Sequence, residues 1–256
     1  MQPSVFIGHG NPLFVLEPNK WTDSWREYFN SIERPQAILA ISAHWYVSYS
    51  AVTISASPKT IHDFGGFPDE LYKVHYEAPG NPELAQQVMS LLEPIDVIED
   101  SSWGLDHGTW SVLYHAFPDA KIPVVQLSID AYQLPSFHLE VGKLLAPLRS
   151  QGVLILGSGN IVHNLRKAKL GIKNSPAYEF AENFDNKVDH WLRDGNVSKL
   201  LDYLDDDDGR LSAPTPDHYL PLLYAYGAKK ESDKLTTITT GIDASSISMR
   251  SIAFHN

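Results

Sequence analysis

The segments IPVVQLSI (Ile122 to Ile129) and VLIL (Val153 to Leu156) decide the fold class of this chain. Each is a short, largely apolar run rich in β-branched residues, which is typical of a buried strand. We expect the stretch 136–149 between them to form a helix. A strand, a helix and a second strand in this order are typical of a parallel pair joined by a helical crossover.

The same alternation continues on both sides of this unit. Runs that are apolar on both faces and alternate with helices predict a largely parallel sheet that helices cover on both sides. We expect further strands at 4–7, 37–41, 52–55, 95–98, 236–239 and 246–254, and helices at 83–92, 110–117 and 176–192.

The length, cysteine content and net charge of the chain exclude or disfavour several kinds of site and partner. The chain has 256 residues, enough for one large domain or two small ones, and contains neither repeats nor a long linker. It has no cysteine, which excludes disulfides, thiolate zinc sites, iron–sulfur clusters and cysteine nucleophiles. The net charge of −11 disfavours nucleic acid and anionic membrane surfaces as partners. Because the N-terminus lacks the features of a signal peptide, we expect a cytoplasmic protein.

Several of the eleven histidines stand at the ends of expected strands. His9 follows the first strand, His44 the second, and His163 the VLIL strand, while His107 lies in a glycine-rich turn before a helix. The carboxyl ends of parallel strands meet at one edge of a sheet. Imidazoles converging there could hold a divalent ion at about 2.0–2.1 Å each, although a single loop histidine is more often a surface residue.

His218 is a further candidate ligand. Pro216 and Pro221 stiffen its segment, and a helix is expected to start close to His218, which would hold the ring rigidly. The Gly157-Ser158-Gly159 turn resembles part of a phosphate loop, but no lysine follows in the required place, so we discount a phosphate site.

Six short motifs occur in an order and with gaps that are similar to those of a known family. They are Gly8–Pro12 (GHGNP), Ser42–Trp45 (SAHW), Ile61–Pro68 (IHDFGGFP), Gly104–Trp110 (GLDHGTW), Ser158–Asn164 (SGNIVHN) and Pro216–Tyr219 (PDHY). Together they resemble the 4,5-DOPA extradiol dioxygenase group of the class III (LigB-type) extradiol ring-cleavage dioxygenases. The resemblance runs from about residue 4 to 250.

The resemblance implies a single α/β/α domain over residues 1–256 with a central, mostly parallel mixed sheet. It implies a divalent metal bound by His9, His44 and His218, with His163 as a possible fourth ligand. His107 and His163 would act in proton transfer. The wider class places a glutamate where this chain has His218. Asp217 could be that carboxylate instead, but neighbours near a helix start rarely point the same way, so we favour His218.

The implied reaction is insertion of O2 into a catechol such as DOPA. Iron(II) would support this activity, whereas zinc, which the group is also described with, cannot cycle electrons.

His163 would be the base, and Asp106 or a backbone carbonyl could fix a histidine tautomer. The segment 61–68 could be a lid over the site or merely an aromatic-packed loop. Four aromatic residues near the motifs could form a wall around the substrate or simply fill the core: Trp45, Trp103, Trp110 and Tyr219.

Two other functions are compatible with these residues. A zinc hydrolase could use three histidines and a bound water on the same scaffold. A non-catalytic metal-binding protein could have kept the fold alone, but such a protein would not need proton-transfer histidines beside the ligands. The expected partners are therefore a small catechol and O2, with neither nucleic acid nor membrane, and the sequence specifies no oligomeric state.

Overall fold

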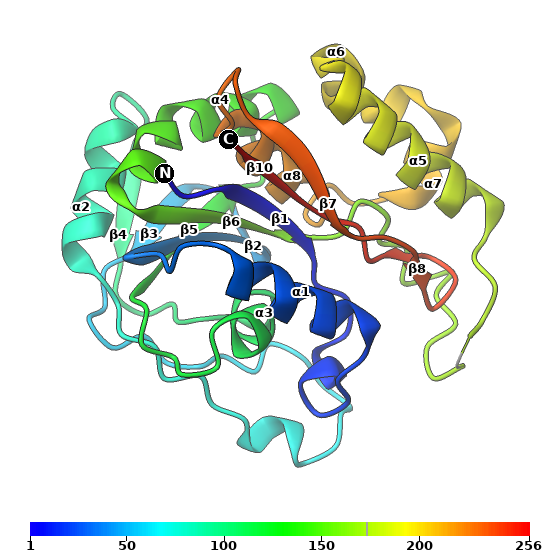
Figure 1. Ribbon diagram of the computed structural model, residues 1–256, viewed down its shortest axis with the longest axis horizontal. Helices are drawn as coiled ribbons and strands as arrows, with labels where there is room; N and C mark the ends of the chain where they lie inside the picture. The colour runs from blue at the N-terminus through cyan, green and yellow to red at the C-terminus, as the bar shows by residue number, and fades with distance from the viewer. Residues whose placement is uncertain (173) are drawn as a thin grey trace.

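A central eight-stranded sheet organises the chain in the computed structural model, which describes residues 1–172 and 174–256 (Figure 1). The strand order is β4-β3-β5-β2-β6-β1-β10-β7. The strands are β1 (Ser4–Gly8), β2 (Ala37–Val47), β3 (Ser50–Thr53), β4 (Val97–Asp100), β5 (Val124–Asp130), β6 (Val153–Gly159), β7 (Lys234–Thr239) and β10 (Ser251–His255). A separate hairpin pairs β8 (Ile242–Asp243) with β9 (Ile247–Ser248).

The sheet is mixed, with a parallel centre. β5, β2, β6 and β1 run parallel to one another, β3 pairs antiparallel with β5, and β10 and β7 add an antiparallel edge beside β1. The IPVVQLSI and VLIL segments are the neighbours of β2 on its two sides. This arrangement confirms the expected fold class.

Helices cover both faces of the sheet (Figure 1). The α-helices are α1 (Lys20–Ser31), α2 (Pro82–Leu91), α3 (His107–Ala116), α4 (Pro135–Leu145), α5 (Glu179–Asp194), α6 (Val197–Leu201), α7 (Asp207–Ser212) and α8 (Leu220–Gly227). Short 3-10 helices are η1 (Pro12–Val15), η2 (Leu71–Lys73), η3 (Ala146–Gln151) and η4 (Tyr203–Asp205). Within the described ranges, no helix combines the length and apolarity that a membrane crossing requires.

The central strands are apolar throughout because both of their faces are buried. Val5 and Ile7 of β1 pack with Trp25 of α1 and Trp110 of α3 in one core, whereas Phe6 packs into the other core. Successive side chains of a strand point to opposite faces, so a strand that is buried on both sides must be apolar at every position. The second core also contains the buried sides of α2, α4, α5 and α8.

Several element boundaries differ from the expected ones, and three of these differences concern the site or the segments next to it. β2 continues to Val47, so His44 lies within the strand and not after it. α3 begins at His107, because the Asp106 side chain caps its start by accepting a hydrogen bond from Thr109 N at 3.1 Å. The expected strand 246–254 is divided into β9 and β10. The sequence analysis did not foresee α1, which a capping box at Asn19 begins.

A buried arginine connects several chain segments at the end of the sheet where the parallel strands begin. The Arg149 guanidinium donates to the carbonyls of Gln2 at 2.8 Å, Ala228 at 2.8 Å and Phe254 at 3.0 Å, and to Asp233 Oδ2 at 2.6 Å. Neither the Arg149 nor the Asp233 side chain is exposed to solvent. These contacts hold the segments before β1, after α8 and within β10 around one charge.

Candidate active site

Five histidines from distant parts of the chain meet at the carboxyl ends of the parallel strands. His9 follows β1, His44 lies in β2, His107 begins α3, His163 follows β6 and His218 precedes α8. The ring centres of His9, His44 and His218 are 5.1, 5.3 and 5.1 Å apart in pairs. All five line one cavity of about 400 Å³. The sequence analysis therefore selected histidines that are true spatial neighbours.

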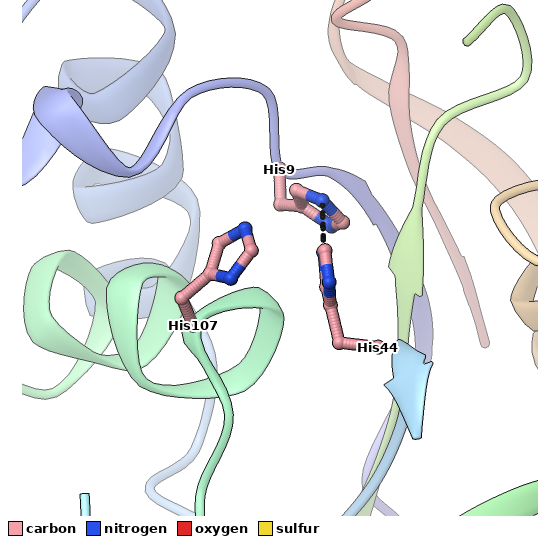
Figure 2. A group of neighbouring side chains, drawn as sticks. All are labelled: His9, His44 and His107. Carbon is pink, nitrogen blue, oxygen red and sulfur yellow. Dashed lines mark hydrogen bonds between the residues drawn. The ribbon is translucent and has the colours of Figure 1, made fainter. Parts of the chain in front are cut away.

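The orientation of the His9 ring is fixed by Ser158 in β6. Ser158 Oγ donates its hydrogen to the carbonyl of Gly108 at 2.6 Å and lies 3.0 Å from His9 Nδ1. Because a hydroxyl has a single hydrogen, Ser158 must accept from His9, which places the proton on His9 Nδ1. His9 Nε2 then carries the lone pair, and it faces His44 Nε2 at 3.2 Å (Figure 2).

The His44 ring is held by a carboxylate from a loop. Asp63 Oδ2 lies 3.2 Å from His44 Nδ1 and 3.0 Å from His107 Nδ1. Asp63 Oδ1 also accepts a hydrogen bond from the backbone N–H of His107 at 2.9 Å. A carboxylate accepts only, so His44 Nδ1 carries a proton, and in the neutral ring Nε2 then carries the lone pair. One loop residue thus orients two of the five rings.

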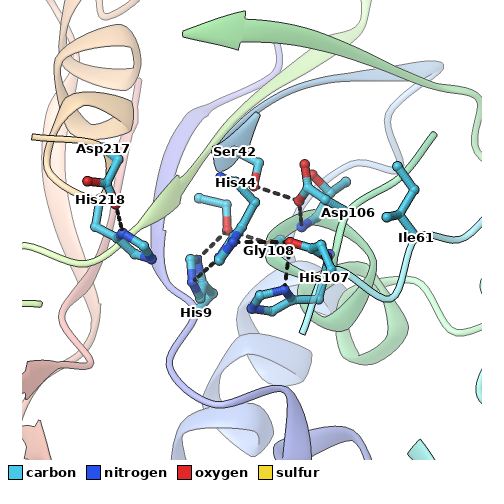
Figure 3. A network of polar contacts seen from close by, with 12 residues as sticks. His9, Ser42, His44, Ile61, Asp106, His107, Gly108, Asp217 and His218 are labelled. Atoms are coloured by element: carbon cyan, nitrogen blue, oxygen red, sulfur yellow. Dashed lines mark hydrogen bonds and ion pairs between the residues drawn. The ribbon is translucent and has the colours of Figure 1, made fainter. Parts of the chain in front are cut away.

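His218 is oriented by its own neighbour. Its Nδ1 contacts Asp217 Oδ2, while its Nε2 is buried and has no hydrogen-bond partner (Figure 3). The segment around His218 packs against glycines of β6, where a Cβ on Gly159 would lie 2.1 Å from the His218 carbonyl. The Gly-Ser-Gly end of β6 is therefore needed for close packing and for holding His9, which agrees with our rejection of a phosphate loop.

These three rings fit a metal ion. Each Nδ1 is engaged by an oxygen of the protein, which is the usual outer partner of a metal-binding histidine, and each Nε2 is left with a lone pair. A cation held at about 2.1 Å by three imidazoles in a tetrahedral arrangement would place the ring centres roughly 5 Å apart. The facing lone pairs of His9 and His44 repel each other unless a cation lies beside both.

His107 and His163 lie on opposite sides of these three rings. The His107 ring centre is 3.8 Å from that of His44, and the His163 ring stacks on His218 with centres 3.4 Å apart. Two sets of donor atoms cluster within 4.8 Å, one of His9, His44 and His107 and one of His163, Asp217 and His218. Both histidines are therefore close enough to act on a molecule that the other three rings surround.

Burial keeps most of these rings neutral. It lowers the pKa of His9 and His218 well below the usual value, and the neighbouring histidines lower it further. Burial also lowers the pKa of His163 to about 4. Burial also opposes protonation of His44, but the hydrogen bond to Asp63 and the negative charges of the nearby aspartates together raise its pKa. Neutral imidazoles are the form that binds metal and accepts protons.

The aromatic wall of the cavity differs from the one considered in the sequence analysis. Phe64 and Phe67 line the cavity and pack against each other with ring centres 5.1 Å apart, so both interpretations of segment 61–68, a lid or an aromatic-packed loop, stay open. Trp45, Trp110 and Tyr219 are almost fully buried, and none of them lines the cavity. Trp103 does not line it either but stacks on Trp45 with ring centres 5.4 Å apart. The hypothesis of a tryptophan wall was therefore wrong, and these residues fill the core.

Sequence reasoning missed the residues that orient the rings. Asp106 was a candidate for fixing a tautomer, but it accepts hydrogen bonds from Ser42 at 2.6 Å and Gln126 at 2.8 Å (Figure 3). Asp63 and Ser158 have this role instead. Both lie inside the quoted motifs, yet a motif alone does not show which ring a side chain faces.

Comparisons with known proteins bear on the family to which this chain belongs. The family described as the catalytic LigB subunit of aromatic ring-opening dioxygenase matches residues 16–254, which include four of the five histidines. A protein of Escherichia coli K12 named 4,5-DOPA dioxygenase extradiol is 47% identical over 98% of this chain and 93% of its own length. A protein of the same name from Beta vulgaris is 36% identical over 99% and 97%. The crystal structure of an uncharacterized E. coli K12 protein matches with a TM-score of 0.88, 42% identity and full coverage of both chains.

Proposed function

The chain belongs to the LigB family of aromatic ring-opening dioxygenases, and from this premise we propose that it is an extradiol dioxygenase that inserts O2 into a catechol such as DOPA. The observation that carries the proposal is the gathering of the His9, His44 and His218 rings, whose centres lie 5.1 to 5.3 Å apart, with two further histidines beside them. We also propose that residues 1–256 work as one catalytic domain, because the five rings come from positions 9 to 218.

His9, His44 and His218 would hold a single divalent metal ion, and His163 is close enough to serve as a fourth ligand. Iron(II) with open coordination positions would supply the redox chemistry that lets O2 react with a catechol, whereas zinc could be bound but cannot cycle electrons. The outer partners of the three rings support this ligand set, because they are the contacts that metal-binding histidines usually make.

The remaining residues of the cavity bind the substrate and move its protons. His163, whose ring is neutral at pH 7, accepts a proton from one catechol hydroxyl. His107, on the other side and held by Asp63, exchanges a proton with an oxygen of the opening ring. Phe64 and Phe67 pack against the aromatic ring and exclude water. Insertion of both oxygen atoms into DOPA beside its hydroxyls gives a seco-DOPA with one new aldehyde and one new carboxylic acid.

The proposal is tested with metal-free protein loaded with iron(II) under anaerobic conditions. Addition of DOPA and air should consume O2 and form a yellow product, and zinc loading should not support this. The variant His163→Ala should keep most metal binding and lose turnover, whereas His190→Ala, an exposed histidine beside Asp194, should behave as the wild type. Normal turnover of His163→Ala would show that the base is misassigned. Hydrolysis by the zinc form without O2 would favour a hydrolase, and metal binding without any turnover a binding protein.

A further inference from the structure

One wall of the cavity is a row of three residues from three neighbouring chain segments. His163 is bridged to Ile247 of β9 by antiparallel pairing, and Ile247 is paired directly with Asp243 of β8. Residues directly opposite each other in antiparallel strands point to the same face. All three residues accordingly line the cavity, with the proposed base at one end, an apolar side chain in the middle and a carboxylate at the other end.

The position of Asp243 is fixed by a tight turn. Ala244 and Ser245, the first two of the three residues that connect β8 to β9, both have positive φ values, of 45° and 66°. The N–H of Ser246 donates to the carbonyl of Asp243 at 3.2 Å and closes the turn. Two successive left-handed residues make the turn type that best fits the twist of a two-stranded hairpin. Asp243 is therefore part of a defined hairpin.

Asp243 is the acidic group of the cavity that no histidine neutralises. The other carboxylate of the lining, Asp63, is engaged by His44 and His107. No ion pair within 4.0 Å joins Asp243 to a cation among the described residues, and no described lysine or arginine lines the cavity. Partial burial raises the pKa of Asp243, while the more distant charge of Lys20 acts in the opposite direction. A cation entering the cavity would relieve the cost of keeping this carboxylate ionised.

We propose that Asp243 binds the ammonium group of an amine-bearing catechol and so orients the catechol ring toward His163. This inference rests on the proposed function and names the chemical class of its substrate. Each antiparallel pair separates Cα atoms by about 5 Å, so the backbones of Asp243 and His163 lie about 10 Å apart along the row. This spacing suits a phenylethylamine whose hydroxyls lie at His163 and whose amine lies at Asp243.

The middle of the row fits the rest of such a ligand. Ile247 is 5% exposed and presents only carbon atoms between the two polar ends, where the alkyl chain of the ligand would pass. A carboxylate in the same place would face Asp243 with no lysine or arginine of the described lining to balance the charge. The cavity should therefore prefer a catechol with a cationic side chain over one with an anionic side chain.

The test compares three catechols that differ only in the side chain: dopamine, 4-methylcatechol and 3-(3,4-dihydroxyphenyl)propionate. With the iron(II)-loaded wild type, kcat/KM for dopamine should exceed that for the propionate by about tenfold or more, as expected for a charge contact that is partly shielded from solvent. Asp243→Asn should lower kcat/KM for dopamine about tenfold. It should leave 4-methylcatechol within about twofold, because this substrate does not reach the carboxylate.

Two further variants make the result decisive. Asp243→Lys should reverse the preference, so that the propionate becomes a better substrate than dopamine. Asp96→Asn, at an exposed position that does not line the cavity, makes the same charge change as Asp243→Asn and should alter no substrate. Equal effects of Asp243→Asn on all three catechols, or no effect on dopamine, would overturn the assignment.

A binding measurement separates this inference from the proposed function. Titration of the zinc-loaded protein with dopamine and with 4-methylcatechol by calorimetry needs no turnover. Asp243→Asn should weaken dopamine binding about tenfold and leave 4-methylcatechol unchanged. If the wild type cleaves none of the three catechols, the proposed function fails, and the calorimetric difference still decides the role of Asp243.

Discussion

Asp63 Oδ2 lies 3.2 Å from His44 Nδ1, so a carboxylate from the loop after β3 fixes a ring that projects from β2. The same oxygen lies 3.0 Å from His107 Nδ1. Burial opposes the ionisation of Asp63, but the hydrogen bonds from His107 and His44 outweigh it and hold the pKa of this carboxyl well below its usual value. Asp63 is thus a positioning residue that connects a proposed metal ligand with a proposed proton-transfer group.

Removal of the Asp63 carboxylate should weaken metal binding. Loss of the outer partner of a metal-binding histidine typically costs about 10–100-fold in affinity, and we expect this loss for zinc binding to Asp63→Ala. The measurement is a competition titration against a chelator of known affinity. Asp69→Asn, an exposed position in the same loop, is the matched control and should bind zinc as the wild type does. Unchanged zinc affinity of Asp63→Ala would contradict a role of Asp63 in positioning His44.

The close approach of two segments at Gly159 gives a second prediction. A Cβ at this position would lie 2.1 Å from the His218 carbonyl, and Gly159 O also accepts the His9 N–H at 3.0 Å. Gly159→Ala should therefore displace both rings, weaken zinc binding and lower the free energy of unfolding by about 1–3 kcal/mol. Urea unfolding and zinc titration check the two effects. Gly65→Ala, where a Cβ meets no atom within 4 Å, should unfold as the wild type does.

The zinc dependence of unfolding tests the ligand set itself. An ion that binds only the folded state should raise the free energy of unfolding by about 2.7 kcal/mol at a concentration of one hundred times its Kd. His218→Gln should lose most of this gain, because it removes a buried Nε2 that has no other partner. His163→Gln should keep most of it if His163 acts mainly as a base. Equal losses in the two variants would instead make His163 a full ligand.

The strands and their parallel pairing could be predicted from the sequence, because they follow from the local pattern of apolar residues. Strands such as VLIL are recognisable because both faces are buried, and parallel pairing then brings the ends of β1, β2 and β6 together. His9 and His163 could be recognised as candidate site residues because each follows a strand that ends at this edge of the sheet. Their convergence was therefore predictable before any side-chain contact was known, and the resemblance to a family selected the same residues.

The remaining features depend on side-chain directions that the pattern does not contain. Asp63 reaches His44 across a loop with no periodicity, so neither its partner nor its direction could be inferred from spacing. Trp45 adjoins His44 in the sequence, but neighbouring residues of a strand point to opposite faces, and the indole is buried in the core. The hairpin that carries Asp243 was not foreseen, because Asp243 lies between the two expected strands 236–239 and 246–254.

The buried pair of Arg149 and Asp233 gives a prediction that does not involve the metal. Burial opposes the ionisation of Asp233, but hydrogen bonds from Arg149 and from the Lys230 backbone, together with the positive charges of Arg149 and Lys229, lower the pKa of this carboxyl. Breaking a buried ion pair leaves an uncompensated charge, so Asp233→Asn should lower the free energy of unfolding at pH 7 by about 3–5 kcal/mol. Urea unfolding at a series of pH values is the measurement, with Asp96→Asn as the control for the loss of one surface carboxylate.

The contribution of this ion pair to the free energy of unfolding changes with pH in a definite direction. Because the pKa of Asp233 is lower in the folded than in the unfolded protein, the ion pair stabilises the fold fully above the unfolded pKa of about 4. This contribution is lost as the pH falls through the lower folded value. The difference between the wild type and Asp233→Asn should therefore stay constant from pH 7 to about pH 5 and become smaller below about pH 4. A difference that is the same at pH 3 and pH 7 would show that the charge of Asp233 is not what stabilises this end of the sheet.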